Sequence, residues 1–89
     1  MQAYQCGIIL IMTGMVEAQV NPALGQRIRE IRKAKGLPLL VLHKLSGVSH
    51  QKIWLLEKWG IIPTHKRDRQ RIAEVLGVPY EELWANVME

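Results

Sequence analysis

The sequence predicts an all-α fold, in which five short helices form an orthogonal bundle that follows an N-terminal arm. Apolar residues recur at helical spacing from Asn21 onward, and no alternation typical of a strand appears after that point. Proline, glycine and capping residues divide this part of the chain into five segments, with links of about two to five residues. Short links keep consecutive helices side by side, so the segments are expected to pack as one bundle.

Residues 1–20 are expected to form the appended arm, and residues 21–89 the helical domain. The arm contains no Lys or Arg, and its apolar run from Ile8 to Met12 is far too short for a membrane-spanning helix. It also lacks the positive start and long apolar stretch of a secretory signal. The run can pair as a strand, cover an apolar surface or be disordered, and a translation start at Met12 or Met15 also fits.

The first helix is expected to begin at Asn21-Pro22 and to end at Gly36. Asn is a good N-cap, Pro is favoured at the first helical position, and Gly is favoured just beyond the last turn. One apolar stripe is formed by Leu24, Ile28 and Ile31. This spacing indicates a helix with a single buried face.

The second helix is expected from about Pro38 to Leu45, with Leu42 and Leu45 facing inward. Gly47 permits a sharp turn after it, because a residue without Cβ adopts positive φ at little cost. Two short helices joined by a glycine-containing turn are typical of the helix-turn-helix arrangement.

The third helix is expected from about Ser49, its N-cap, to Lys58, with Ile53 and Leu56 facing inward. Val48 is expected to fill the angle between the second and third helices. Thus the stretch from the second helix to the end of the third has helix-turn-helix spacing.

Two further helices complete the prediction. Thr64 is the expected cap of the fourth helix, from about His65 to Leu76. The fifth is the short segment 80–84. Trp59, which follows the third helix, is expected to pack under the loop before the fourth.

Positive charge is concentrated in the middle of the chain. All twelve Lys and Arg residues lie between Arg27 and Arg71, together with three acids, a balance of +9. The remaining five acids carry −5, which gives the net charge of +4. This distribution favours a surface that contacts phosphate, although a solubilising coat of basic side chains would have the same composition.

Three runs of sequence match one family in order and spacing. They are LGQRIREIRKAKGL, HKLSGVS and IAEVLGVPYEELW. Together they resemble the Cro/C1-type (XRE, lambda-repressor-like) helix-turn-helix family, over roughly Leu24 to Trp84. The resemblance implies a five-helix domain that binds double-stranded DNA, usually as a homodimer, with the third helix in the major groove. It implies a prokaryotic or phage-type transcriptional regulator, repressor-like and cytoplasmic. It also implies a core position for Trp84, which with Leu83 matches the closing hydrophobic pair of the family.

Candidate contacts follow from the outward face of the third helix. Gln can make a two-point contact with adenine, and Lys can reach phosphate or guanine. Base contacts are expected from His50, Gln51, Lys52, Trp54 and Leu55. Phosphate contacts are expected from Arg27, Lys44, Ser49, Lys58, Lys66 and Arg67. Phosphate contacts of this kind are salt-dependent and independent of base sequence.

The sequence departs from the family on this same face. The family usually starts the second helix with Thr and a phosphate-binding Gln, where this chain has Pro38 and Leu39. The resulting apolar cluster comprises Leu39, Leu40, Trp54 and Leu55. Three explanations stay open: Trp54 or Leu55 contacts thymine methyl groups, the cluster binds a protein partner and DNA binding is lost, or residues 8–12 fold back over it.

Other chemistry is not indicated. His43, His50 and His65 lack the spacing of metal ligands, and Cys6 stands alone, so neither a metal nor a cofactor is expected. No set of residues points to nucleophilic or acid–base catalysis, and an enzyme is not expected. Glu57 matches a near-constant Glu of the family, which implies a structural role in hydrogen bonds that support the next loop.

Overall fold

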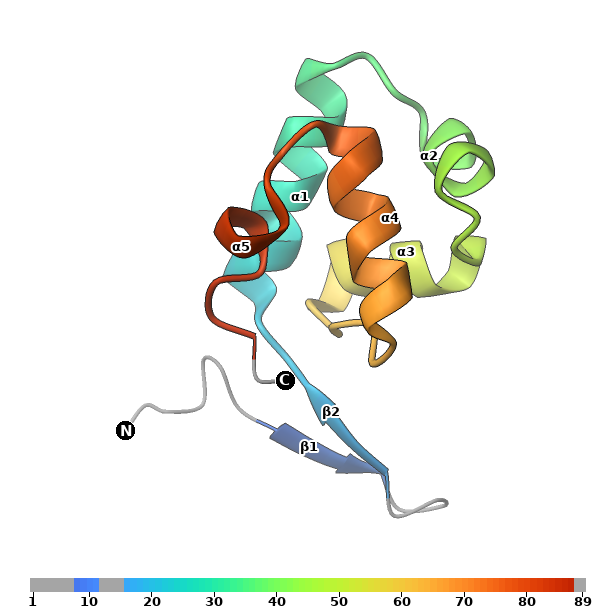
Figure 1. Cartoon of the computed structure of the whole chain (residues 1–89). Coiled ribbons are helices and arrows are strands. Elements are labelled where there is room, and N and C mark those ends of the chain that lie inside the picture. The colour runs from blue at the N-terminus through green and yellow to red at the C-terminus, as the bar shows by residue number, and fades with distance from the viewer. Residues whose placement is uncertain (1–7, 12–15, 88–89) are drawn as a thin grey trace.

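Five helices form the bundle, as the sequence predicts, and a two-stranded hairpin precedes them (Figure 1). The computed structural model describes residues 8–11 and 16–87. The strands are β1 (Ile8–Ile11) and β2 (Val16–Gln19), and the helices are α1 (Pro22–Ala34), α2 (Leu39–Ser46), α3 (His50–Trp59), α4 (Lys66–Leu76) and α5 (Tyr80–Leu83). The predicted helical fold class is therefore confirmed.

Local signals account for the start of α1 and for the α2–α3 turn. The Asn21 side chain accepts a hydrogen bond from the Leu24 N–H at 3.2 Å, and the Ser49 hydroxyl accepts one from the Lys52 N–H at 3.1 Å. Gly47 ends α2 with φ of 75°, the left-handed conformation that glycine adopts most easily. Two of the three predicted N-caps and the predicted turn are thus confirmed.

The core is formed by apolar residues of all five helices. Its fully buried side chains are Ile28, Leu42, Ile53, Leu56, Ile72, Leu76 and Leu83. Burial of one such side chain stabilises the fold by about 1.5–3 kcal/mol. Val48 is buried between α2 and α3, and Trp84 is buried with its indole N–H donating to the Arg69 carbonyl at 3.0 Å. Both were predicted to be core residues.

Two expectations for the helices are wrong. Leu45 is 53% exposed, because Leu42 and Ser46 form the buried stripe of α2 and the Arg71 guanidinium binds the carbonyls of Leu45 and Ser46. Thr64 does not cap α4: the N-cap is His65, without a side-chain hydrogen bond. The buried Arg69 donates to the carbonyls of Pro63 and Thr64, and this fixes the loop before the helix begins.

The expected position of Trp59 is also wrong. Its side chain is 54% exposed at the end of α3 rather than packed under the following loop. Gly60 ends the helix in a left-handed turn, and Ile62, not Trp59, is the buried apolar residue of the loop. The Lys58 ammonium lies 5.8 Å from the centre of the Trp59 ring.

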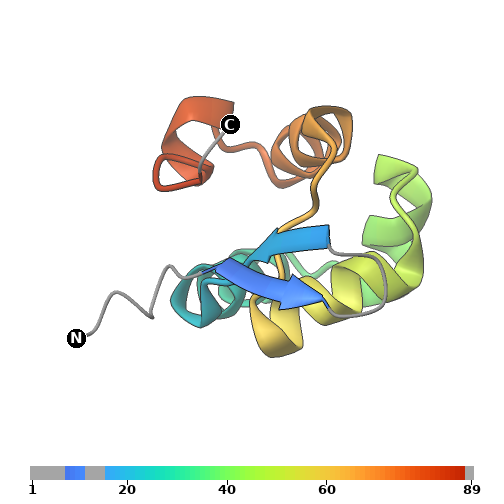
Figure 2. The same ribbon diagram turned by 90° about the horizontal axis from the view of Figure 1, so that it is seen from below.

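The arm pairs as a strand, one of the three behaviours left open. β1 and β2 are antiparallel, with Ile8 opposite Gln19, and the Gln19 carbonyl accepts a hydrogen bond from the Ile62 N–H at 2.9 Å. Figure 2, the view from below, shows the two strands side by side at this end of the molecule. Leu40 and Trp54 remain 51% and 42% exposed, so the described part of the arm does not cover the apolar cluster; Met12 lies outside the described residues.

Candidate nucleic-acid interface

Helix α3 is held against α1 by direct contact between their backbones. A Cβ atom at Gly25 would collide with the carbonyl oxygen of Leu56, and it would lie 3.2 Å from the Cα of Gly60. Only glycine fits at this crossing without a shift of one helix. The face of α3 opposite this contact is therefore presented outward by a rigid support.

A buried ion pair adds a second constraint on α3. The Arg32 guanidinium donates to both carboxylate oxygens of Glu57, at 2.7 and 2.9 Å, and to the Leu37 carbonyl at 2.7 Å. The two charged side chains are 10% and 7% exposed. Glu57 thus has a structural role, as expected. It was expected to support the loop after α3, however, and its hydrogen-bond partner is the Arg32 side chain of α1. Arg32 was missed, although its i+4 spacing from Ile28 places it on the inward stripe.

The outward face of α3 contains the predicted base-contact residues. His50, Gln51 and Trp54 are exposed, and Leu55 is partly buried. The His50 ring meets the His43 ring edge to face at 6.1 Å, and Nδ1 of His43 lies 2.6 Å from the Val48 carbonyl. In the described part of the chain, no hydrogen bond or ion pair engages the Gln51 side chain. This face is available to a ligand.

A groove runs along the side of α3 that faces α1 and α2, which we call the α1 flank. It encloses about 450 Å³ above the Arg32–Glu57 pair. Its other lining residues are Gln26, Arg29, Leu39, Trp54 and Lys58. The Lys58 ammonium lies 5.6 Å from the centre of the Trp54 ring, within range of a cation–π interaction. Arg29, exposed and three residues before Arg32, is a cation of this groove that sequence reasoning missed.

The opposite side, the α4 flank, is arranged differently. The Lys52 ammonium forms an ion pair with the Asp68 carboxylate of α4 at 3.1 Å. The Lys52 side chain is 48% exposed and that of Asp68 is 19% exposed. Arg67, next to Asp68, is exposed. Lys52, which was predicted to contact DNA, is therefore paired with an acid of its own chain.

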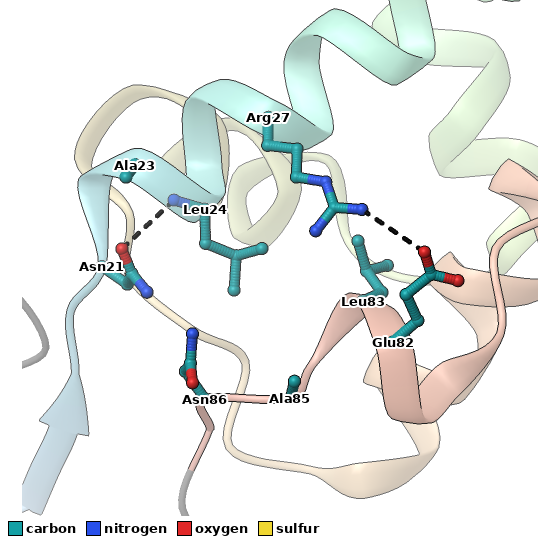
Figure 3. A pocket seen from close by; sticks show the side chains of 8 residues that line it. All are labelled: Asn21, Ala23, Leu24, Arg27, Glu82, Leu83, Ala85 and Asn86. Atoms are coloured by element: carbon teal, nitrogen blue, oxygen red, sulfur yellow. Dashed lines mark hydrogen bonds and ion pairs between the residues drawn. The ribbon is translucent and has the colours of Figure 1, made fainter.

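The remaining phosphate candidates do not all gather at α3. Lys44 is exposed on α2, and the Ser49 hydroxyl is engaged as the cap of α3. Arg27 faces α5, where it lies 3.9 Å from the Glu82 carboxylate beside a pocket of about 240 Å³ (Figure 3). The Lys66 ammonium lies 5.5 Å from the centre of the Tyr80 ring, also toward α5. Thus the structure does not bring Arg27 and Lys66 together with the others.

Neither a metal-binding cluster nor a membrane-spanning helix occurs among the described residues. No group of three or more His, Cys, Asp or Glu side chains is placed to hold a metal ion within residues 8–11 and 16–87. In the same part of the chain, no helix has the length and apolar character needed to cross a membrane.

Comparison with known proteins gives one family and several similar structures. A family model described as a helix-turn-helix domain matches residues 23–85. The restriction-modification controller protein C.AhdI from Aeromonas hydrophila is 32% identical, with a TM-score of 0.62, and the match covers 70% of this chain and 92% of that one. No curated protein sequence matches significantly.

Two structures of one further regulator are also similar. The N-terminal DNA-binding domain of SinR from Bacillus subtilis is 26% identical, with a TM-score of 0.65, over 78% of this chain and all of that one. SinR, described as the master regulator for biofilm formation and solved in complex with DNA, is 28% identical, with a TM-score of 0.61, over 67% and 95% of the two chains.

Proposed function

This chain belongs to the helix-turn-helix domain family, the family its sequence predicts, and we propose that it is a sequence-specific, DNA-binding transcriptional regulator of the Cro/C1 type. The observation that carries the proposal is α3 itself: its inner side is fixed by Gly25 and the Arg32–Glu57 pair, and its outer side exposes His50, Gln51 and Trp54 and is flanked by cations. The DNA complex of SinR supports the assignment. We place the protein in the cytoplasm of a prokaryotic cell, as a repressor-like regulator.

Helix α3 enters the major groove in this proposal. Gln51, in the first turn and exposed, contacts adenine through its amide, and His50 contacts a neighbouring base edge. Trp54 and Leu55 follow on the same face, where their apolar surface suits the methyl group of thymine. Lys52 lies at the edge of this face, toward α4.

Phosphate contacts come from both sides of α3. The proposed donors are Lys44 of α2, the hydroxyl of Ser49, Lys58 of α3 and Arg67 of α4, all of which are exposed residues. Arg29 joins Lys58 as a cation of the α1 flank and takes the place of the polar residue absent at Leu39. Arg27 and Lys66 are not among the proposed phosphate contacts, because both side chains interact with α5.

We also propose that the active species is a homodimer. One small module buries only about 600–1,000 Å² of protein surface on DNA and contacts few base pairs. Two copies related by a two-fold axis double the number of base contacts and match a pseudo-palindromic site. Sedimentation equilibrium, with and without a selected duplex, measures the stoichiometry; a single copy on a site that it binds tightly would contradict the dimer.

The test of DNA binding is a titration of labelled duplexes of random sequence at low and moderate salt. Binding is expected at low salt, where the attraction to phosphate is strongest, and selection from the random pool is expected to enrich one motif. No complex at low salt would falsify the proposal. Replacement of Gln51 by Ala is expected to change the enriched motif while leaving binding to unselected DNA intact.

The exposed apolar cluster supports one alternative function. Leu40 is 51% exposed and Trp54 42% exposed, which is typical of a surface that contacts another macromolecule. On this alternative the domain is a protein-interaction module. The double change Trp54→Ser and Leu55→Arg discriminates: loss of partner binding with unchanged DNA affinity favours the interaction module, and a change in DNA affinity alone favours the regulator.

A further inference from the structure

The acid nearest the exposed face of α3 is Asp68. Among the three acids of the basic segment, Glu57 is buried with Arg32, and Glu30 accepts a hydrogen bond from the Gln26 side chain on α1 at 3.2 Å. Asp68 instead lies in the first turn of α4 and reaches across to the Lys52 ammonium, 3.1 Å away on α3. Its charge therefore acts directly beside the surface proposed to contact DNA.

We propose that Asp68 is a positioning residue for DNA binding: it holds Lys52 against α4 and so keeps one cation of α3 away from the DNA backbone. The inference rests on the proposed function. A free Lys at the third position of α3 neutralises a phosphate in any register on any sequence. By binding this ammonium, Asp68 lowers the part of the affinity that is independent of base sequence.

The two partners of this ion pair differ in exposure. Lys52 is half exposed and Asp68 largely covered, so the lysine is the partner that a phosphate can reach and the carboxylate is the one that stays in place. The charged neighbours in the first turn of α4 are Lys66 and Arg67, both exposed, and Lys66 is directed to the Tyr80 ring. Asp68 and Lys52 are thus the pair that sets how many cations the α4 flank offers.

The experiment measures the affinity of the full chain for an unselected duplex between about 50 and 200 mM salt. The proteins are wild type, Lys52→Gln, Asp68→Asn and the double variant. Each phosphate neutralised contributes about −0.9 to the slope of log K against log salt. Asp68→Asn is expected to bind about fivefold more tightly at low salt, with a slope steeper by about 0.9. Lys52→Gln and the double variant are expected to keep the wild-type slope. Lys52 neutralises no phosphate in any of these three proteins, because Asp68 holds it in the wild type and the two variants lack it.

Three controls separate this role from general charge or folding effects. Glu74→Gln removes one acid from the same helix, but its partner Arg71 keeps its bonds to the carbonyls of Leu45 and Ser46, so the slope is expected to stay unchanged. Asp68→Glu keeps the charge and is expected to restore the wild-type slope. Melting curves followed by circular dichroism report whether each variant is folded.

Two results overturn the inference. A shallower slope for Lys52→Gln means that Lys52 already contacts phosphate in the wild type, and an unchanged slope for folded Asp68→Asn means that the carboxylate restrains nothing. A shallower slope for Lys52→Gln overturns the inference even if Asp68→Asn does not fold. Absence of any wild-type complex at low salt is a different outcome, which contradicts the proposed function itself.

Discussion

The two flanks of α3 each carry an acid, but they place it differently. On the α1 flank the acid is Glu57, buried and bound by the equally buried Arg32, so Lys58 and Arg29 in the groove above are left without an acid among the described residues. On the α4 flank the acid is Asp68, which is largely covered but binds the half-exposed Lys52. We expect the exposure of the cation to decide whether the carboxylate only stabilises the fold or also competes with DNA for that cation.

The largest expected effect comes from breaking the buried pair. Glu57→Ala leaves the Arg32 charge buried without a partner, and we expect the free energy of unfolding to fall by about 3–5 kcal/mol. Urea unfolding followed by circular dichroism measures this loss. The matched change on the other flank, Asp68→Ala, is expected to cost at most about 1 kcal/mol. Equal losses for the two variants would show that burial does not distinguish the pairs.

The next effect concerns the cations of the α1 flank. Arg29→Gln and Lys58→Gln are each expected to weaken binding to all duplexes and to make the salt slope shallower by about 0.9, because each removes one phosphate contact. The control is Lys35→Gln, which removes an exposed charge at the end of α1, where the ammonium lies beside Gly77. A slope for Arg29→Gln that equals that of Lys35→Gln would exclude Arg29 from the interface.

The exposed Trp54 side chain is expected to contribute little to the stability of the fold. Its ring is 42% exposed and lies beneath the Lys58 ammonium, so Trp54→Ala is expected to lower the free energy of unfolding by only about 1 kcal/mol. The fully buried neighbour Ile53 provides the contrast, with an expected loss of about 2–5 kcal/mol on change to Ala. Thermal and urea unfolding of the two variants checks both values. A loss at Trp54 as large as that at Ile53 would indicate a core role.

The smallest expected effect is on the stability of the α4 flank. Lys52→Gln removes a partly exposed ion pair, and we expect the free energy of unfolding to change by less than about 1 kcal/mol. The change is also expected to shrink at high salt, because exposed pairs are screened. Unfolding at two salt concentrations measures this. A loss that does not depend on salt would point to packing of the lysine stem instead.

Features encoded by neighbouring residues could be predicted from the sequence. Asn21 and Ser49 cap their helices through bonds to N–H groups three residues away, and Gly47 needs only its own backbone conformation. The predictions of a buried Leu45 and of a Thr64 cap were wrong, because arginines of α4 that are distant in sequence bind the carbonyls at the end of α2 and before α4. The strands of the arm were left open, since a four-residue strand is defined by its partner rather than by its own pattern.

In the candidate site too, local features could be predicted from the sequence and contacts between distant residues could not. Helical periodicity was sufficient to predict that His50, Gln51 and Trp54 of α3 are exposed, but not that Leu55 is partly buried. It was insufficient for the ion pair of Arg32 with Glu57, whose partners are 25 residues apart, and for the orientation of Arg27 toward Glu82. Contacts between helices depend on how the helices cross, and a single sequence carries little information about that geometry.

The glycine contact between α1 and α3 has a consequence for how this protein can change its target. Because the crossing is made by backbone at Gly25, the orientation of α3 does not depend on the side chains it displays outward. Exposed residues such as His50 and Gln51 can then be exchanged while the scaffold beneath stays in register. A bundle supported in this way is suited to diversification: new target sequences are acquired on one face, at little cost to the stability of the rest.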